Sequence, residues 1–174
     1  MEDHALGALT DLESTVIAKD SRPLENKNSS EAIAVLGALV LSLVAQANID
    51  RRRLLGVGVG LAGVVDSEHG ILRESPFFGW RDLPLRDLLQ NLVQTPVYLD
   101  NDVNTLTLAE QWFGAGQGVD HFLVVTVGRG IGLGVVVDAA QADATAATLR
   151  ALGESVYAIG TIAPRGDGAA VVVA

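Results

Sequence analysis

Polar side chains crowd the stretch "VYLDNDVNTLTLAEQWFGAG", residues 97–116, where an apolar strand is expected to pass directly into a helix. Asp100, Asn101, Asp102 and Asn104 fall at this junction. Because ligands of open α/β sheets bind beyond the carboxyl ends of the strands, these side chains are expected to face a crevice. Asn101 can donate and accept hydrogen bonds, whereas ionised Asp102 only accepts them. Together they suit the hydroxyl groups of a polyol.

Two other roles fit the same residues. Asp102 within reach of a hydroxyl group could act as the general base in phosphoryl transfer. Alternatively, Asn101 or Asp102 only caps the helix, which contributes about 1 kcal/mol through amide hydrogen bonds and the helix dipole. The residues by themselves leave these alternatives open.

Two glycine-rich segments could also bind a ligand. In "GVGVGLAG", Gly58, Gly60 and Gly63 match the G-x-G-x-x-G pattern of dinucleotide sites. Extended chain and turns are expected after Gly63, so no helix N-terminus is available for a pyrophosphate. This segment is either a plain turn or a loop that closes over another ligand. In "VGRGIGLG", residues 127–134, the glycines would let backbone amides approach an anion or let two strands pack tightly.

Composition excludes several classes of function. The 174 residues are 49% hydrophobic, enough for one sizeable core or two small lobes. The formal charge of -9 argues against a broad nucleic-acid surface. With no cysteine and no ligand spacing among the three histidines, neither a disulfide nor a metal centre is expected. The apolar residues 32–49 are long enough to raise the question of a membrane span, but Gln46, Asn48 and the polar flanks favour a buried helix. The chain shows no signal-peptide charge pattern, so the cytoplasm is the expected location.

The pattern along the chain predicts an α/β domain with mostly parallel strand pairing. The expected elements are a hairpin within residues 5–24, a helix over 31–47 capped by Ser29 or Ser30, and a strand running into glycines within 54–66. They continue with a helix over 85–92, a strand over 96–99, a helix from Asp102, a hairpin over 121–138, a helix over 142–152 and two short strands. The basic run at 51–53 is expected where the first helix ends.

Four segments, "GVGVGLAGVVD", "SPFFGWRDLPL", "VYLDNDVNTLTLAEQWFGAG" and "VGRGIGLGVVVD", occur in an order and spacing that resemble the ROK family of sugar kinases and sugar-responsive repressors. The resemblance covers residues 1–138. It implies an actin-like (ribonuclease H-like) ATPase fold of two lobes with a sugar bound between them. The expected lobes are residues 1–116 and 117–174, the second containing the hairpin over 121–138.

The resemblance also implies roles for single residues. Asn101 matches the sugar-binding asparagine of the family, and Asp102 matches the catalytic base of its kinases. The loop through Gly63 would lie beside the sugar. The glycines of "GRGIGLG", which are Gly128, Gly130 and Gly132, match the loop that contacts ATP phosphate in the kinases.

Departures from the family pattern favour its repressor branch. Arg129 stands where kinases usually carry threonine, a choice that resembles the repressor members. Phe77 stands where many members place a sugar-contacting asparagine, which weakens the expected recognition of a hexose. The sequence lacks the first Asp-Gly-Gly-Thr strand and the cysteine-rich zinc motif. The expected function is therefore the sugar-effector-binding domain of a ROK-type transcriptional regulator, truncated and non-catalytic, with no cofactor. The alternatives are an ATP- and Mg-dependent hexose kinase with Asp102 as base, or a structural chain with neither activity.

The expected truncation has further consequences. No winged helix-turn-helix precedes Met1, so the chain is not expected to bind DNA directly. A missing first strand in the middle of an actin-like sheet would leave strand edges uncovered. Marginal folding or homo-oligomerisation is therefore expected.

The end of the chain resembles a different family. Residues 139–174 are similar to the carboxyl terminus of aminoimidazole ribonucleotide synthetase (phosphoribosylformylglycinamidine cyclo-ligase), on the basis of "LRALGE" followed by "VYAIGTI". This similarity predicts an αββ ending and a chimeric chain, and implies no catalytic residue there. The alternative is an ordinary αββ ending with chance similarity.

Overall fold

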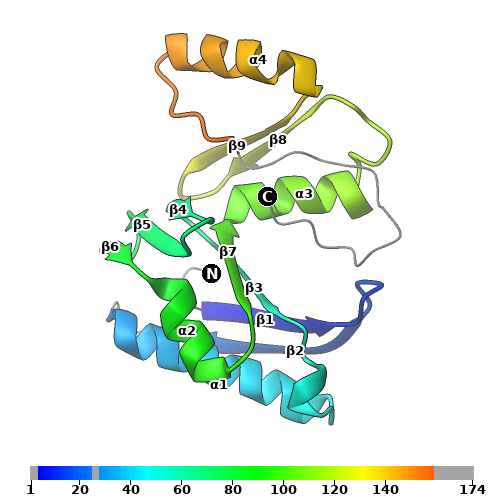
Figure 1. Ribbon diagram of the computed structural model, residues 1–174, viewed down its shortest axis with the longest axis vertical. Coiled ribbons are helices and arrows are strands. Elements are labelled where there is room, and N and C mark those ends of the chain that lie inside the picture. The colour runs from blue at the N-terminus through cyan, green and yellow to red at the C-terminus, as the bar shows by residue number, and fades with distance from the viewer. Residues whose placement is uncertain (1–3, 25–27, 159–174) are drawn as a thin grey trace. The chain divides into compact units, whose positions relative to one another are not determined.

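The computed structural model describes residues 4–24 and 28–158, coloured along the chain in Figure 1. They divide into two compact units between Asn101 and Asp102. The sequence instead predicts a boundary after residue 116. The difference arises because the helix that follows Asn101 packs against the strands after it and therefore belongs to the second unit.

The first unit begins with the predicted hairpin, in which β1 (His4–Thr10) pairs antiparallel with β2 (Val16–Pro23). The carboxylate of Asp11 closes the turn by accepting hydrogen bonds from the amides of Glu13 and Thr15, both at 2.9 Å. The inward residues Ala5 and Leu9 pack against α1 (Ser29–Gln46) and form one apolar cluster with it. Asn28 caps α1 by accepting from the Ser30 amide, where Ser29 or Ser30 is the predicted cap.

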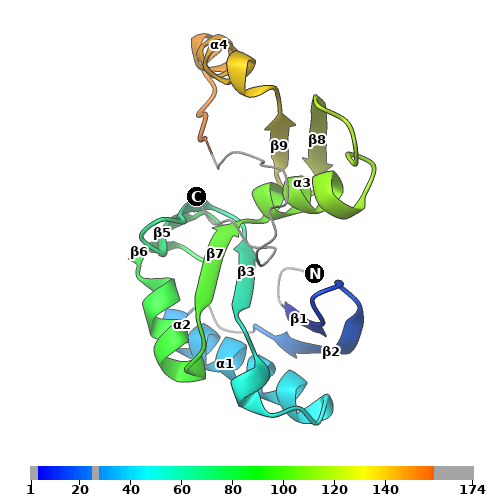
Figure 2. The ribbon, with the colours of Figure 1, turned by 45° about the vertical axis from the view of Figure 1, so that its right-hand side comes forward.

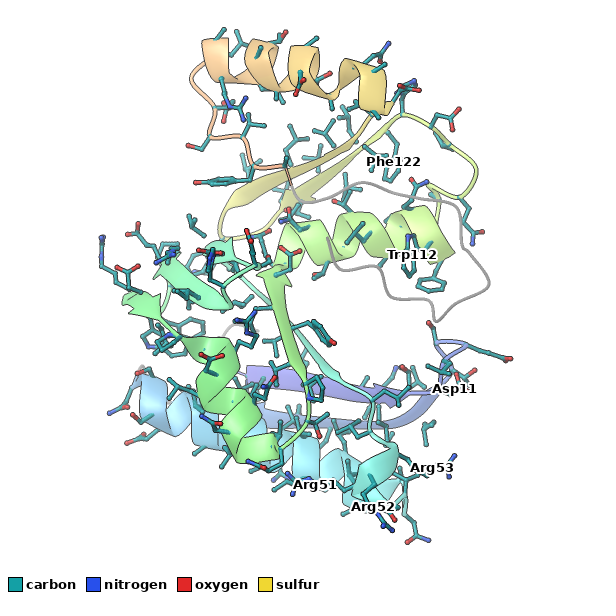
Figure 3. All side chains as sticks on the ribbon, in the orientation of Figure 1. Asp11, Arg51, Arg52, Arg53, Trp112 and Phe122 are labelled. Atoms are coloured by element: carbon teal, nitrogen blue, oxygen red, sulfur yellow. The ribbon has the colours of Figure 1, made fainter. Side chains whose placement is uncertain are left out.

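By length and composition α1 could cross a membrane. The contacts of its buried residues are those of a core helix, because Leu39 and Leu43 lie against β1 and Gly37 lies against Leu92 of the next helix. The basic run, whose residues are labelled in Figure 3, forms a short 3₁₀ helix of its own, η1 (Arg51–Arg53), whereas the sequence predicts it where the first helix ends. Arg52 pairs with Asp50, and the guanidinium of Arg51 donates to the carbonyl of Val93.

A parallel pair of strands lies at the centre of this unit. β3 (Val57–Leu61) and β7 (Val97–Asn101) run side by side in both ribbon views, in register from Val57 opposite Val97 to Leu61 opposite Asn101 (Figures 1 and 2). The helix α2 (Leu85–Val93) packs against β7 through residues spaced four apart. The core formed with α1 contains Ile33, Leu85, Leu89, Val93, Val97 and Leu99.

Between β3 and α2 the chain forms a small antiparallel sheet from β4 (Val64–Asp66), β5 (Ile71–Ser75) and β6 (Trp80–Leu83). The expectation of extended chain and turns after Gly63 is thus confirmed. The expectation of mostly parallel pairing is wrong for the described residues, where β3–β7 is parallel and the other pairs are antiparallel. The connections are too short for anything else, since a parallel crossover needs a dozen or more residues.

The second unit contains α3 (Asp102–Phe113), β8 (Phe122–Val127), β9 (Ile131–Val136) and α4 (Ala139–Ala151). β8 and β9 form the predicted antiparallel hairpin, and α3 packs against both strands. Asp138 caps α4 by accepting from the Ala140 amide at 2.7 Å. The segment "VYAIGTI" and the chain end, where two short strands are predicted, lie mostly outside the described residues.

Candidate functional site

The candidate site lies at the edge of the sheet where β3 and β7 end together. Leu61 and Asn101 are paired in register, so the turn at residues 62–63 begins beside Asn101, the last residue of β7. This is the carboxyl end of both parallel strands, the edge at which open α/β sheets bind ligands.

A hydrogen bond joins the two halves of this edge. The side-chain amide of Asn101 donates from Nδ2 to the carbonyl oxygen of Gly63 at 3.0 Å. The backbone amide of Asn101 donates to Oδ1 of Asp100 at 2.6 Å. The structure therefore brings together Gly63 and Asn101, two of the residues that the sequence singles out. Their contact fixes which way the Asn101 amide faces.

Position 63 requires a glycine, both because of its backbone conformation and because of the residues around it. Its φ of 138° lies in a region that side chains rarely adopt, and a β-carbon there would collide with the carbonyl oxygen of Glu74. The turn thus lies with its backbone directly against β5. The same backbone path runs into β4, so "GVGVGLAG" here is a strand followed by a turn and not a dinucleotide loop.

Asp102 follows Asn101 as the first residue of α3. Its exposed carboxylate accepts from the Val103 amide at 3.0 Å, and its carbonyl accepts from Oγ1 of Thr105 at 2.8 Å. A negative charge at this position is favourable because it lies at the positive end of the helix dipole. The capping alternative thus has a contact in its favour, and the carboxylate is also accessible to a ligand.

The glycines predicted to contact phosphate lie in the hairpin of the second unit and differ from one another. Gly128 and Gly130 belong to the turn between β8 and β9, where the amide of Gly128 donates to the carbonyl of Gly130 at 2.9 Å. A β-carbon at either would meet nothing within 4 Å. At Gly132 it would lie 2.5 Å from Cγ2 of Val103 and 2.6 Å from Oγ1 of Thr126. Close packing against α3 therefore accounts for Gly132.

Charged residues gather on the β4–β5–β6 sheet, and none of them belongs to the site predicted from the sequence. Asp66 accepts from Arg73 at 2.6 Å and lies 2.9 Å from Nδ1 of His69, while Arg73 also reaches Asp82 at 3.1 Å. The His69 ring, the His69 amide and the Arg73 guanidinium together hold the pKa of the Asp66 carboxyl well below its usual range. This cluster is a set of structural ion pairs along the sheet.

Two positions that sequence reasoning missed also act on the turns of this unit. Arg86 of α2 donates to the carbonyls of Glu68 and His69, at 2.9 and 2.8 Å, and so holds the turn between β4 and β5. Ser75, at the end of β5, donates from Oγ to the carbonyl of Ala62 at 3.1 Å. The serine before Pro76 in "ESPFF" was the available signal, although the pattern alone is typical of many turns.

The β1–β2 hairpin carries a hollow that is separate from this edge. This shallow hollow includes none of the candidate residues; it is lined by Leu6, Gly7, Ala8, Lys19, Asp20 and Ser21. Within residues 4–24 and 28–158, no three histidine or acidic side chains are grouped as metal ligands would be.

The family model of the ROK family matches residues 2–145, and the chain belongs to this family. The match extends past Asp138, where the resemblance was expected to end, into α4. The α/β fold is accordingly part of the actin-like ATPase fold of ROK proteins.

Relatives from both branches of the family are similar to the chain. The glucokinase of Halalkalibacterium halodurans is 37% identical over 59% of this chain and 33% of its own length. The xylose repressor of Bacillus subtilis is 29% identical over 78% of this chain and 35% of its own. The chain thus spans about a third of the length of these relatives.

The chain is also similar to the solved structure of a ROK family transcriptional regulator, which is described as a homologue of the E. coli MLC protein. It superposes with a TM-score of 0.71 at 26% identity, covering 78% of this chain and 34% of that one. Similarity to glucokinases and to repressors means that the family alone does not choose between the two activities.

Proposed function

We propose that this chain binds a sugar through Asn101, Asp102 and the turn at Gly63, as the effector-binding part of a ROK-type transcriptional regulator. The observation that carries the proposal is the hydrogen bond from Nδ2 of Asn101 to the Gly63 carbonyl, at the shared carboxyl end of β3 and β7. A preorganised amide at such an edge is a means of fixing the orientation of a small polar ligand.

The chemistry of these residues matches a polyol. Each sugar hydroxyl both donates and accepts, so its site needs groups of both kinds. The amide of Asn101 supplies both kinds, and the next residue, Asp102, supplies a carboxylate that only accepts. The net charge of -9 is compatible with a neutral ligand of this kind.

Arg129 supports the regulator branch. It stands in the turn between β8 and β9 where the kinases of the family usually carry threonine. The similarity to a xylose repressor and to a regulator related to MLC is compatible with this branch. The proposed ligand is therefore a pentose or hexose that acts as an effector, with no cofactor taking part.

Thermal melting of the full chain against hexoses, amino sugars and pentoses tests this proposal, because a ligand that binds only the folded state raises the melting temperature. Asn101→Ala is the test variant, and Asn91→Ala, on the exposed side of α2, is the matched control. We expect one class of sugar to raise the melting temperature of the wild type and of Asn91→Ala but not of Asn101→Ala. A rise that survives in Asn101→Ala would place the ligand elsewhere, and no rise with any sugar would contradict sugar binding.

A second candidate is ATP-dependent phosphorylation of a hexose with Asp102 as general base. It is favoured by the 37% identity to a glucokinase and by the exposed carboxylate of Asp102. Gly128, Gly130 and Gly132 would then approach the phosphates of ATP with its Mg²⁺. ADP release in the presence of each sugar measures this activity, and Asp102→Asn should abolish it. A wild type that binds sugar but releases no ADP favours the regulator.

A further inference from the structure

Ser75 is a polar residue with 0% of its surface exposed, at the last position of β5. Its side chain and its backbone bond to two different turns. Oγ donates to the carbonyl of Ala62 at 3.1 Å, and the carbonyl of Ser75 accepts from the Gly79 amide at 2.9 Å. A single buried residue thus joins the turn at 62–63 to the turn at 76–79.

The turn at 62–63 is held from both sides. On the β5 side, Ser75 binds the Ala62 carbonyl, and the backbone of Glu74 lies directly against Gly63. On the β7 side, Asn101 binds the Gly63 carbonyl. Because two consecutive carbonyls are bound by donors from two different strands, neither peptide plane can rotate without breaking a hydrogen bond.

We infer that Ser75 is a positioning residue of the sugar site, which fixes the 62–63 turn and, through the Gly63 carbonyl, the amide of Asn101. This inference rests on the proposed function. Ser75 is completely buried, so it acts through the turn and not on the ligand. Without the Ser75 hydroxyl, the turn samples other orientations, and the apparent affinity falls by the fraction of molecules in the competent one.

The test compares Ser75→Ala with Thr95→Val in the full chain. Thr95 is 5% exposed, lies in the same unit, and donates from Oγ1 to the Val93 carbonyl at 3.3 Å, away from the 62–63 turn. Both variants lose one buried hydroxyl, and both should melt at a lower temperature than the wild type. Only Ser75→Ala should weaken sugar binding, by about tenfold in calorimetric titration, the ratio expected for one hydrogen bond.

A second measurement needs no sugar. The side-chain amide resonances of Asn101 should move in Ser75→Ala and stay in place in Thr95→Val, because only the first variant frees the Ala62 carbonyl and so loosens the turn whose Gly63 carbonyl Asn101 binds. Ser75→Cys keeps a weaker donor at this position and should fall between the wild type and Ser75→Ala in both affinity and resonance position. If Ser75→Ala does not fold, Ser75→Cys alone gives the comparison with Thr95→Val.

The outcomes distinguish a failure of the positioning role of Ser75 from a failure of sugar binding itself. Equal affinities in the Ser75 and Thr95 variants, with the Asn101 resonances unmoved, would overturn the positioning role and leave sugar binding intact. A wild type that binds no sugar would overturn the proposed function, and the positioning role with it. Weakened binding together with moved resonances would establish both.

Discussion

The side chain of Thr107, 1% exposed in α3, occupies the space that a β-carbon at Gly134 of β9 would need. Oγ1 of Thr107 donates to the Val103 carbonyl at 2.7 Å, which holds the side chain in that place. Gly132, one pleat earlier on β9, lies in the same way against Val103. The alternating glycines of "GIGLG" therefore let the helix approach the strand closely, whatever else the loop does.

This contact predicts the effect of filling the gap. Gly134→Ala should destabilise the second unit by about 1–3 kcal/mol, the usual cost of overpacking. Chemical denaturation monitored by circular dichroism measures the change. Gly130→Ala is the control, because a β-carbon at Gly130 would meet nothing within 4 Å. Equal stabilities of the two variants would show that α3 does not pack on β9 as described.

A second prediction concerns the turn of the candidate site. Gly63→Ala should destabilise the first unit by about 1–3 kcal/mol, because it combines a strained φ with a collision against the Glu74 carbonyl. Gly58→Ala in β3 meets nothing within 4 Å and is the control from the same segment. The change is measured as the free energy of unfolding in urea. In addition, any sugar that raises the melting temperature of Gly58→Ala should fail to raise that of Gly63→Ala. A normal sugar response in Gly63→Ala would contradict the role of the turn.

Some of this fold could be predicted from the sequence because the signals are local. Leu85, Leu89 and Val93 recur at helical spacing, and they form one buried face of α2. The two hairpins also follow from apolar runs separated by turn residues. The pairing direction was predicted wrongly because β4, β5 and β6 are short strands joined by tight turns, and an alternation of strands and helices does not reveal such an insertion.

The candidate site was predictable to a different degree. Asn101 and Gly63 follow two apolar strands, so a sequence argument can place both at strand ends, and the family resemblance places them together. The contact of Ser75 could not be predicted, since its partner is a backbone carbonyl and a serine before a proline is typical of many turns. For Gly132 the sequence predicts either contact with an anion or tight packing of two strands, but not the contact with Val103, because that residue belongs to a helix distant in the sequence.

A third prediction separates the donor of Asn101 from its size. Asn101→Asp keeps the shape of the side chain but replaces Nδ2 by an oxygen facing the Gly63 carbonyl. Two acceptors then face each other, and the first unit should lose about 1–3 kcal/mol of stability. Urea denaturation measures this loss. Asn91→Asp on α2 makes the same chemical change at an exposed position and should leave the stability within about 0.5 kcal/mol of the wild type. Similar values for the two variants would mean that the hydrogen bond to Gly63 contributes little.

A fourth prediction concerns the stability of the protein at acidic pH. The hydrogen bonds from His69 and Arg73 lower the pKa of Asp66 in the folded protein below its ordinary value of 3.8. The unfolded chain therefore takes up this proton at a higher pH than the folded protein does. The stabilisation is fully present above pH 3.8 and is lost as the pH falls below 3.8 towards the pKa of the folded state. Urea midpoints between about pH 2 and pH 7 should thus fall steeply at the acidic end.

Two variants test whether Asp66 and its partners His69 and Arg73 cause this fall of the urea midpoint at acidic pH. Asp66→Asn removes the titrating group, so its urea midpoint should be lower than that of the wild type near neutral pH and should change less on acidification. Arg73→Gln removes the donor at 2.6 Å from Asp66 and leaves the contact with His69. Its urea midpoint should therefore also be lowered near neutral pH and change less on acidification, but both effects should be smaller than in Asp66→Asn. The grading follows because His69 contributes the largest part of the lowering of the pKa and Arg73 a smaller part. An unaltered slope in Asp66→Asn would assign the acid sensitivity to other carboxylates, of which Asp20 and Asp50 also have lowered pKa values.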